Sequence, residues 1–203
     1  MELDVTTLSA RAGSGGVNVV ESNALVIGDV SVLPGDLQSD VRTSANGTIV
    51  VVVSAGDLEL TDGTAPADAV AVSADGSGLV RLESVDANGA VKMGAGVQSG
   101  SGDITILAGA DMEMAAGIVL ETAGNGSIDL EARAGDFEMS ASARIESVNG
   151  DIRIVSGDAV GDRMVIGDIV AANANVSLEA SGSIVDAGDS DAEVSAVGLR
   201  MVA

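Results

Sequence analysis

Acidic side chains in the last third of the sequence are the residues best suited to binding a metal ion. They form two groups, which comprise Asp158, Asp162 and Asp168, and Asp186, Asp189, Asp191 and Glu193. Calcium takes about six to eight oxygen ligands and favours acidic loops, so a calcium-dependent assembly module is one interpretation. The sequence contains neither a Gly-Gly-x-Gly-x-Asp repeat nor an EF-hand loop. We favour a structural role, in which Asp caps backbone amides in turns, and we assign no metal ligand or cofactor.

Three charged residues in the middle of the chain suggest a different chemistry, the cleavage of polysaccharides. Asp129 and Arg153 occupy equivalent positions in two successive repeats of the sequence, and Arg81 holds the same position in an earlier one. Carbohydrate-cleaving enzymes work with acidic side chains placed around the scissile bond, so a polysaccharide-active lyase or hydrolase is a second interpretation. Opposite charges on neighbouring strands more often form a cross-strand ion pair. We therefore assign no catalytic residue and expect the protein not to be an enzyme.

The composition excludes several common kinds of site. The 203 residues include no His, Cys, Trp or Tyr, and Phe137 is the only aromatic residue. Catalysis through a His-paired nucleophile and the usual zinc sites are therefore excluded, and aromatic platforms for single-stranded nucleic acid are missing. The net charge of -22 also opposes binding to a phosphate backbone. No apolar run approaches the roughly 18 residues of a membrane span, so we expect no nucleic-acid partner and no membrane insertion.

The elements that position these charges are predicted by the repeat. Pairs of apolar residues separated by one polar residue recur at a constant interval of about 24 residues, at Val80/Leu82, Ile104/Ile106, Ile128/Leu130, Ile152/Ile154 and Val176/Leu178. Alternation of this kind is typical of a strand with one buried face. Two further short apolar pieces follow in each repeat, with Gly-rich steps between them that suit tight corners. Each repeat is therefore predicted to form three short strands, with most of the methionines in the core.

Short strands that recur at a constant interval predict an all-β fold, a right-handed parallel β-helix or β-solenoid of about seven to eight coils. A β-sandwich is the alternative, but it gives no reason for a constant interval. We predict one solenoid over residues 1–203, with longer coils in 1–74 and regular coils in 75–203. In the second coil we place the third strand at Val30/Val32. Loops at 33–40 and 62–68 are the best candidates for specific contacts.

Two stretches carry a resemblance to a known family. Residues 124–139 read GNGSIDLEARAGDFEM, and residues 181–188 read SGSIVDAG. Both resemble the repeats of filamentous-haemagglutinin-like giant bacterial exoproteins, which are right-handed parallel β-helices. The resemblance implies an extracellular or cell-surface adhesin shaft that displays contacts to a host or cell-surface receptor or a glycan. Because a terminal coil leaves unpaired strand edges, we also expect end-to-end self-association.

Overall fold

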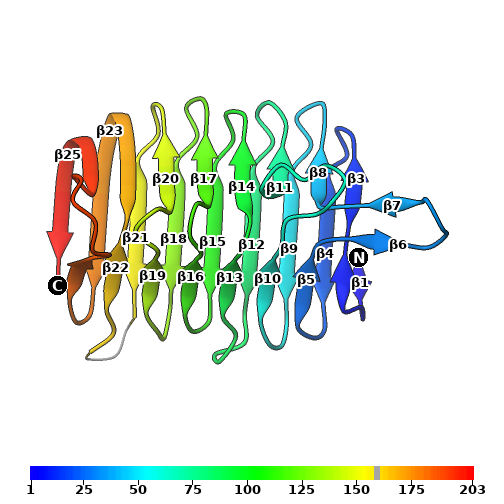
Figure 1. The fold of residues 1–203 in the computed structure, drawn as a ribbon, viewed down its shortest axis with the longest axis horizontal. Helices are drawn as coiled ribbons and strands as arrows, with labels where there is room; N and C mark the ends of the chain where they lie inside the picture. The colour runs from blue at the N-terminus through cyan, green and yellow to red at the C-terminus, as the bar shows by residue number, and fades with distance from the viewer. Residues whose placement is uncertain (158–160) are drawn as a thin grey trace.

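The computed structural model describes residues 1–157 and 161–203, and they wind as a stack of parallel strands (Figure 1). Each coil contributes one strand to each of three faces, which we name the first, second and third face in chain order. The second face is an 8-stranded sheet with one strand from every coil. The all-β parallel β-helix with three short strands per coil is therefore confirmed.

The first and third faces belong to one 15-stranded sheet. The first face contains β1 (Glu2–Leu3), β4 (Val17–Glu21), β9 (Ile49–Val53), β12 (Val80–Ser84), β15 (Ile104–Ala108), β18 (Ile128–Ala132) and β21 (Ile152–Ser156). The third face contains β3 (Ala10–Ala12), β8 (Val41–Thr43), β11 (Val70–Ala74), β14 (Gly96–Ser99), β17 (Val119–Thr122) and β20 (Arg144–Ser147). Two long strands continue from the third face to the first and join them, namely β23 (Asp168–Ala180) and β25 (Val194–Val202).

The second face is formed by the short strands in the middle of each coil. It contains β2 (Thr7–Leu8), β5 (Leu25–Ile27), β10 (Leu58–Leu60), β13 (Val91–Met93), β16 (Met112–Met114), β19 (Phe137–Met139), β22 (Met164–Ile166) and β24 (Ile184–Asp186). One antiparallel hairpin, formed by β6 (Val30–Ser31) and β7 (Leu37–Gln38), stands apart from these sheets. Because all the assigned elements are strands, residues 1–157 and 161–203 contain no helix long and apolar enough to cross a membrane.

The pairing register reproduces the repeat in the sequence. Ile104 pairs with Ile128, and Ile128 pairs with Ile152, so each step along this column advances the chain by one repeat. The first-face column continues in both directions, to Val80 and to Val176. These side chains are almost fully buried. The second members of the apolar pairs form a parallel column in the same way, through Ile106, Leu130, Ile154 and Leu178, all fully buried. The inward side predicted for both members of each apolar pair is therefore confirmed.

Columns of like side chains fill the interior. Phe137, the only aromatic residue, lies between Met112 and Met164 on the second face, and all three are fully buried. Methionine has a flexible thioether side chain that fills irregular gaps. The remaining methionines divide between buried positions on the second face and exposed ends of the chain, as Met1 and Met201. The core position predicted for most methionines is confirmed.

The corner between the third and first faces explains the recurring Gly in the sequence. A Cβ atom at Gly126 would lie 2.1 Å from the carbonyl oxygen of Gly102, one coil earlier. Thr122 Oγ1 donates a hydrogen bond to that same oxygen at 3.2 Å, and Ser147 Oγ donates in the same way to the carbonyl of Gly126 at 3.0 Å. The buried hydroxyl groups are thereby satisfied, and the coils approach closely because Gly has no side chain.

The second coil differs from the prediction. Val30 belongs to the hairpin, Val32 is 80% exposed, and the third strand of this coil is β8. The alternation Val-x-Val predicts an inward strand, but here it lies in one arm of an antiparallel hairpin that leaves the stack. The placement of the third strand at Val30/Val32 was therefore wrong, and residues 28–40 form one long corner.

Candidate functional site

The three charged residues singled out in the sequence lie on the outer side of the first face, and all are engaged in ion pairs. Arg153 Nη1 lies 2.7 Å from Asp129 Oδ1 on the neighbouring strand, and this hydrogen bond raises the pKa of Arg153. Arg81 Nη2 lies 2.5 Å from Glu83 Oε2. The cross-strand ion pair predicted for Asp129 and Arg153 is confirmed.

Glu83 is the buried member of this group. It is only 6% exposed, although it lies on the outer side of β12. Arg133 Nη2, two coils further along the stack, donates a hydrogen bond to Glu83 Oε1 at 3.0 Å. Burial alone would raise the pKa of Glu83, but the hydrogen bonds from Arg81 and Arg133 hold it below its usual value. This pair does not follow from the repeat in the sequence, because its separation of 50 residues is not a multiple of 24.

Further contacts connect these pairs into one network. Arg133 Nε and Arg153 Nη1 each lie 3.7 Å from a carboxylate oxygen of Glu131. The complete network comprises Arg81, Glu83, Arg133, Glu131, Arg153 and Asp129. Each guanidinium group contacts carboxylates of its own or another coil. The network therefore links neighbouring coils to one another along the first face. A hydrolase that works with a pair of carboxyl groups needs one of them to stay protonated as the acid. The pKa of Glu83 is instead lowered, because the effect of its burial is outweighed by the hydrogen bonds from Arg81 and Arg133.

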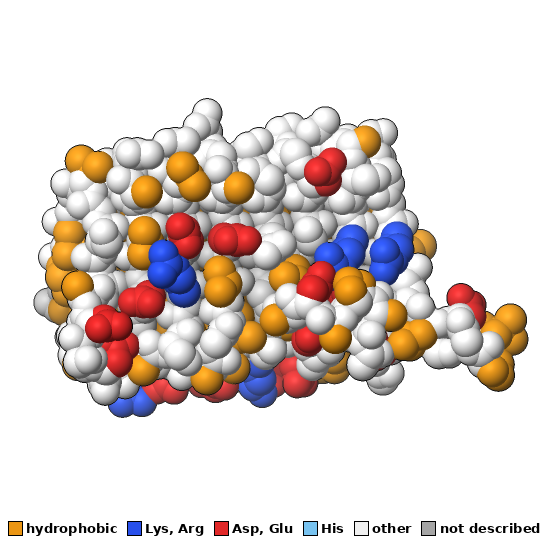
Figure 2. Space-filling model, turned by 45° about the horizontal axis from the view of Figure 1, so that its top comes forward, with side chains coloured by type: hydrophobic (Ala, Val, Ile, Leu, Met, Phe, Trp, Pro, Cys, Tyr) orange, Lys and Arg blue, Asp and Glu red, His pale blue; other side chains and the backbone are white. Residues whose placement is uncertain are grey.

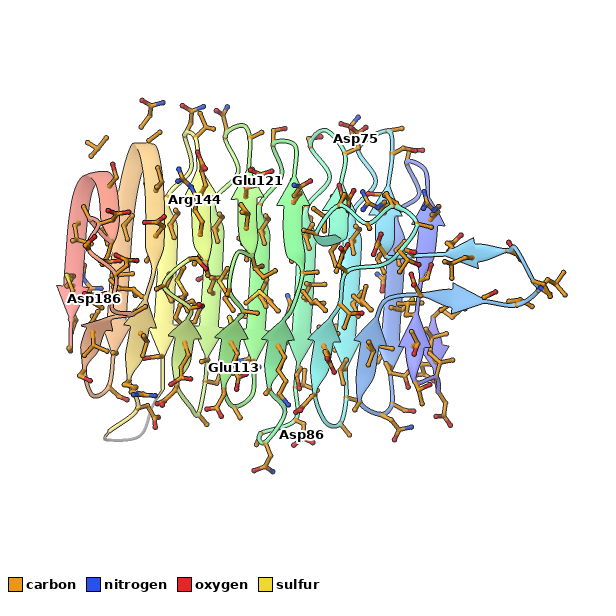
Figure 3. All side chains as sticks on the ribbon, viewed as in Figure 1. Asp75, Asp86, Glu113, Glu121, Arg144 and Asp186 are labelled. Atoms are coloured by element: carbon orange, nitrogen blue, oxygen red, sulfur yellow. The ribbon has the colours of Figure 1, made fainter. Side chains whose placement is uncertain are left out.

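Acidic residues at the corners accept hydrogen bonds from the backbone of a neighbouring coil. Asp103 Oδ1 accepts a hydrogen bond from the amide of Ser127, one coil further on, at 2.8 Å. Asp75, Asp86 and Asp151 accept backbone amides from neighbouring coils in the same way. Asp75 and Asp86 are seen at opposite edges of the stack in Figure 3. The capping role that we favoured for corner Asp residues is confirmed for these positions.

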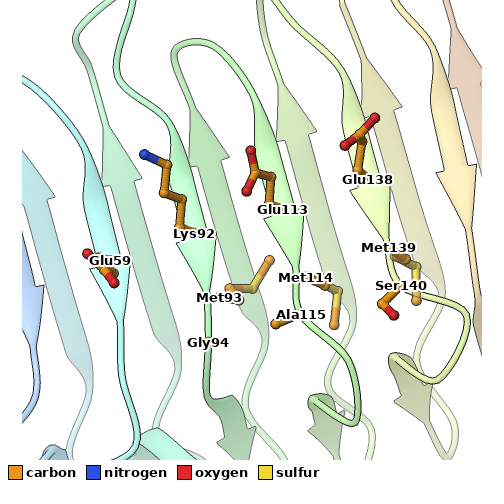
Figure 4. A pocket seen from close by; sticks show the side chains of 10 residues that line it. All are labelled: Glu59, Lys92, Met93, Gly94, Glu113, Met114, Ala115, Glu138, Met139 and Ser140. Carbon is orange, nitrogen blue, oxygen red and sulfur yellow. The ribbon is translucent and has the colours of Figure 1, made fainter.

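The second face carries a row of charged side chains that the sequence analysis did not single out. Glu59, Lys92, Glu113 and Glu138 are the middle residues of four consecutive strands, β10, β13, β16 and β19. They border an open groove of about 380 Å³, and Lys92, Glu113 and Glu138 project from its strands in Figure 4. The signal was the polar residue inside LEL, VKM, MEM and FEM, which recurs with the repeat.

Two cations neutralise part of this row. Lys92 Nζ lies 2.5 Å from Asp57 Oδ2, and this contact raises the pKa of Lys92 and lowers that of Asp57. Arg163 contacts Glu138 and lies 3.1 Å from Asp136 Oδ2. As on the first face, several charged side chains here link successive coils, and we assign the groove no ligand.

The acidic residues near the C-terminus form one small cluster. Carboxylate oxygens of Asp186, Asp189 and Glu193 lie within 4.8 Å of one another. Burial raises the pKa of Glu193, and the nearby charges of Asp189, Asp186 and Asp168 raise it further. The carboxylate of Asp191 does not belong to this cluster; the backbone amide of Asp191 donates a hydrogen bond to Asp189 Oδ1 at 2.9 Å. The cluster holds three carboxylate groups, and calcium takes about six to eight oxygen ligands, which include backbone carbonyls and waters as well as carboxylates.

The other acidic group expected from the sequence is not brought together. Asp158 lies outside the described residues. Asp162 lies between β21 and β22, whereas Asp168 begins β23 near Glu193. The sequence grouping of Asp162 and Asp168 therefore reflects their proximity along the chain, because a strand and a corner separate them in the fold.

The C-terminal end of the stack combines apolar and acidic side chains. Leu199 and Met201 continue the inward columns of the first face, and they are 49% and 50% exposed. On the second face, however, Asp186 occupies the position held by Ile166 in the coil before. A carboxylate at the end of an apolar column disfavours contact with another apolar surface. End-to-end association stays a prediction, and Asp186 opposes it.

The hairpin is the most prominent projection on the molecule. It extends past β1 and β3 along the long axis (Figure 1). Val32 and Leu33 at its tip are 80% and 64% exposed, and Leu37 is also exposed. Figure 2 shows the hydrophobic side chains gathered at this tip. The part of the predicted contact loop that faces solvent is thus the tip of the hairpin.

The base of the hairpin is packed against the second long loop. Ser39 and Asp40, which fall within the predicted contact loop, are fully buried. Asp40 Oδ1 accepts a hydrogen bond from the amide of Gly63 at 3.0 Å, and Arg42 Nη2 lies 3.2 Å from Asp40 Oδ2. Asp29 accepts hydrogen bonds from both Ser39 and Thr64. The two loops named in the sequence analysis therefore support each other, and the buried end of 33–40 is unavailable for contacts.

These observations define the class of the protein as a parallel β-solenoid whose charged side chains mainly connect successive coils. The sequence matches no family model, no curated protein and no solved structure. The comparisons thus add no evidence for the resemblance to filamentous haemagglutinin. What is established is the solenoid class.

Proposed function

We propose that this chain is a shaft segment of a secreted or cell-surface bacterial fibre of the filamentous-haemagglutinin-like kind, acting as a spacer and as a scaffold for display. The observation that carries the proposal is the uninterrupted stack of in-register columns. Adjacent strands in a sheet lie about 4.8 Å apart, so every added coil extends the rod by a fixed amount. Such a structure holds its two ends a fixed distance apart, and this distance does not depend on the residues at its corners.

The distribution of charge supports a mechanical role. The network on the first face joins residues from several coils, and the corner carboxylates hold backbone amides of the following coil. Contacts of this kind resist separation of the coils along the axis. The excess of acidic side chains also opposes sideways aggregation of neighbouring rods, because like charges repel.

The hairpin supports a display role. It leaves the stack at the corner between the second and third faces without interrupting the columns on either face. A receptor or a glycan is the partner class that we propose for this projection. Loops on a rigid scaffold are the usual carriers of binding function, because they vary without disturbing the core.

Deleting one coil tests the spacer role. Removal of residues 104–127 connects Asp103 to Ile128, which pairs in the same column as Ile104. We expect the variant to keep its far-ultraviolet β-sheet spectrum and cooperative unfolding. Spin labels placed at Arg81 and Ser177 should come closer by about 4.8 Å. The matched control removes residues 104–115 only, which breaks the register and should prevent folding. A full-coil deletion that unfolds like the control would contradict the proposal.

Two further measurements test the remaining parts of the proposal. An antibody against this chain should detect it on the surface of its source cells or in the culture medium, and recovery from the cell interior alone would contradict export. Incubation with acidic and neutral polysaccharides should release no new reducing or unsaturated ends. Release of such ends would contradict the shaft proposal and would show that the protein is a polysaccharide-cleaving enzyme.

A further inference from the structure

Two corners of the rod carry the acceptor sequence for N-linked sugars. They read Asn46-Gly47-Thr48 and Asn125-Gly126-Ser127, and both fit the pattern Asn-x-Ser/Thr in which x is not Pro. The pattern alone is short and common. Its placement in the fold is what makes these two positions informative.

Asn46 and Asn125 occupy the same position in their coils. Each lies three residues before the first inward residue of a first-face strand, Ile49 and Ile128, and those two residues belong to one column. Both Asn side chains are exposed at the corner between the third and first faces. Three coils separate the two positions, so they lie about 14 Å apart along the same edge of the rod.

The amide groups of both residues leave the reactive nitrogen accessible. Asn46 Oδ1 accepts a hydrogen bond from the amide of Ser77 at 2.9 Å. Asn125 Oδ1 accepts a hydrogen bond from Asn149 Nδ2 at 3.1 Å. Within residues 1–157 and 161–203, no hydrogen bond uses Nδ2 of Asn46 or Asn125. Each side chain is therefore oriented by its oxygen while its nitrogen faces solvent.

A third triplet, Asn175-Val176-Ser177, differs in both respects. Asn175 lies inside β23 and not at a turn. Its Nδ2 donates a hydrogen bond to Asp151 Oδ1 at 3.2 Å. We therefore exclude Asn175 from the proposed sites.

We propose that Asn46 and Asn125 are acceptor sites for N-linked glycosylation, with an activated sugar diphosphate as the donor class. The Nδ2 atom forms a bond to the anomeric carbon, and the bond from that carbon to the diphosphate oxygen breaks. The diphosphate leaves with the electron pair of the broken bond, and Nδ2 gives up one proton to a carboxylate of the transferase that catalyses the step. The product is a secondary amide that keeps its carbonyl oxygen. The hydrogen bonds from Ser77 and Asn149 to these oxygens are therefore preserved.

The inference rests on the export part of the proposed function, because sugars on an outer corner would lie on the surface that an exported rod presents to its surroundings. The sugars would form a row along one edge of the rod, at a different corner from the one that carries the hairpin. They would add bulk to a corner that is otherwise formed mainly by small and polar residues, namely Gly, Ser, Asn and Asp. The shaft geometry itself does not depend on them.

The chain contains a matched control for both sites. Asn149-Gly150-Asp151 occupies the same position of its coil as the two proposed sites, since Ile152 continues the column of Ile128. It differs from them in two respects: it lacks the hydroxyl residue that the acceptor pattern requires, and its Nδ2 donates hydrogen bonds to the Gly124 carbonyl at 3.3 Å and to Asn125 Oδ1 at 3.1 Å. A transferase that recognises the pattern should modify Asn125 and leave Asn149 unmodified, although both are Asn-Gly corners at the same place in the coil.

The test is peptide mass spectrometry of the full chain recovered from the surface and the interior of its source cells. We expect sugar on Asn46 and Asn125 and none on Asn149. Thr48→Ala should abolish the modification at Asn46, and Ser127→Ala that at Asn125. Asp151→Ser completes the acceptor pattern at Asn149, but Asn149 Nδ2 is already a donor to the Gly124 carbonyl and to Asn125 Oδ1, so we expect this variant to carry no sugar at Asn149; sugar there would contradict the requirement for a free Nδ2. Incubation of the purified chain with a membrane-free extract of its source cells and a nucleotide sugar distinguishes a nucleotide-sugar donor from a lipid-linked one, because a lipid-linked donor requires the membrane fraction.

Two results would overturn the inference. One is surface-exposed protein in which Asn46 and Asn125 are both unmodified, a result that leaves the shaft proposal intact. The other is sugar that persists at Asn125 in the Ser127→Ala variant, because attachment would then be independent of the pattern. Recovery of the chain from the cell interior alone contradicts the export part of the proposed function and not the acceptor sites. Sugar on Asn46 and Asn125 of that interior protein would still support this inference.

Discussion

The coils that begin at β4 and β9 contain more residues than the coils that begin at β12, β15, β18 and β21, which all have the same length. Despite this difference, the inward columns run through both regions without a break. The additional residues all enter at the corner between the second and third faces. Strand pairing therefore determines the pitch of the stack, while the length of this corner is free to vary.

The two regions also differ in how they hold charged groups. The longer coils bury Asp40 completely, beside Arg42 and the amide of Gly63, at the base of the two long loops. The regular coils keep most of their ion pairs on the outer side of the first face. Loops that leave the stack thus need a buried polar anchor, whereas regular coils are held by columns alone and reinforced from outside.

The largest expected effect is on the apolar columns of the regular region. Leu130 is fully buried, and Leu130→Asp would place an unpaired charge inside the stack. We expect a loss of about 4 kcal/mol or more in the free energy of unfolding. Thr105→Asp adds the same group to the outer side of the neighbouring coil and should cost within about 0.5 kcal/mol. Urea denaturation compares them, and equal losses would refute the inward columns.

The buried anchor of the longer coils gives the next effect. Asp40→Ala removes the acceptor of the Gly63 amide and one partner of Arg42. We expect a loss of about 3 kcal/mol, because a buried polar group is left without its partner. Asp68→Ala removes the more exposed partner of Arg42 and should cost below about 1 kcal/mol. If the two variants lose equal stability by urea denaturation, Asp40 is not the anchor.

The buried carboxylate of the first-face network predicts a dependence on pH. The pKa of Glu83 is lower in the folded chain than its ordinary value of 4.5. Its contribution to stability is therefore complete above that ordinary value and is lost as the pH falls through the folded pKa. Glu83→Gln should cost about 1–2 kcal/mol at neutral pH, and its stability should fall less than that of the wild type on acidification.

Glu113→Gln supplies the control for this measurement, since Glu113 is an exposed residue on the second face. Its stability at neutral pH should change by within about 0.5 kcal/mol, because an exposed side chain outside a buried network contributes little. Melting temperatures recorded across the acid range decide the matter. A Glu83→Gln profile parallel to the wild type would show that Glu83 gains nothing from Arg81 and Arg133.

The smallest effect is expected from the hairpin. Val30 and Gln38 are paired across the two arms, so the intervening residues 31–37 are replaceable by an Asn-Gly turn. The exposed tip contributes little to the core, and the expected change in the free energy of unfolding is within about 0.5 kcal/mol. Calorimetry measures this change. A loss comparable to that of Asp40→Ala would show that the tip, and not the buried base, supports the longer coils.

The regular region was predictable because successive residues of each column are separated by one constant repeat of the sequence. A shift of one repeat aligns Ile104, Ile128 and Ile152, and alternation then identifies the inward side of each strand. The second coil was not predictable in this way. Val30 and Val32 alternate as an inward strand would, whereas β8 offers only the three residues Val41–Thr43. Alternation reports one buried side of a strand but not which neighbour the strand pairs with.

The candidate site was predictable only in part, for a related reason. Asp129 and Arg153 are one repeat apart, so their ion pair follows from the spacing. Arg133 reaches Glu83 across an intervening coil, at a separation that depends on side-chain length and not on the repeat. The long reach of an arginine side chain is therefore the feature that repeat analysis could not supply.

Pulsed dipolar spectroscopy tests most directly the claim that strand pairing alone determines the pitch. The chain has no Cys, so spin labels attach only at introduced positions. One label at Ser177 is paired in turn with Arg81, Val50 or Asn18, which lie four, five and six coils away in one outward column. We expect distances of about 19, 24 and 29 Å, with equal steps although the coils differ in length. Unequal steps that follow the number of residues, or distances unrelated to coil number, would contradict the account.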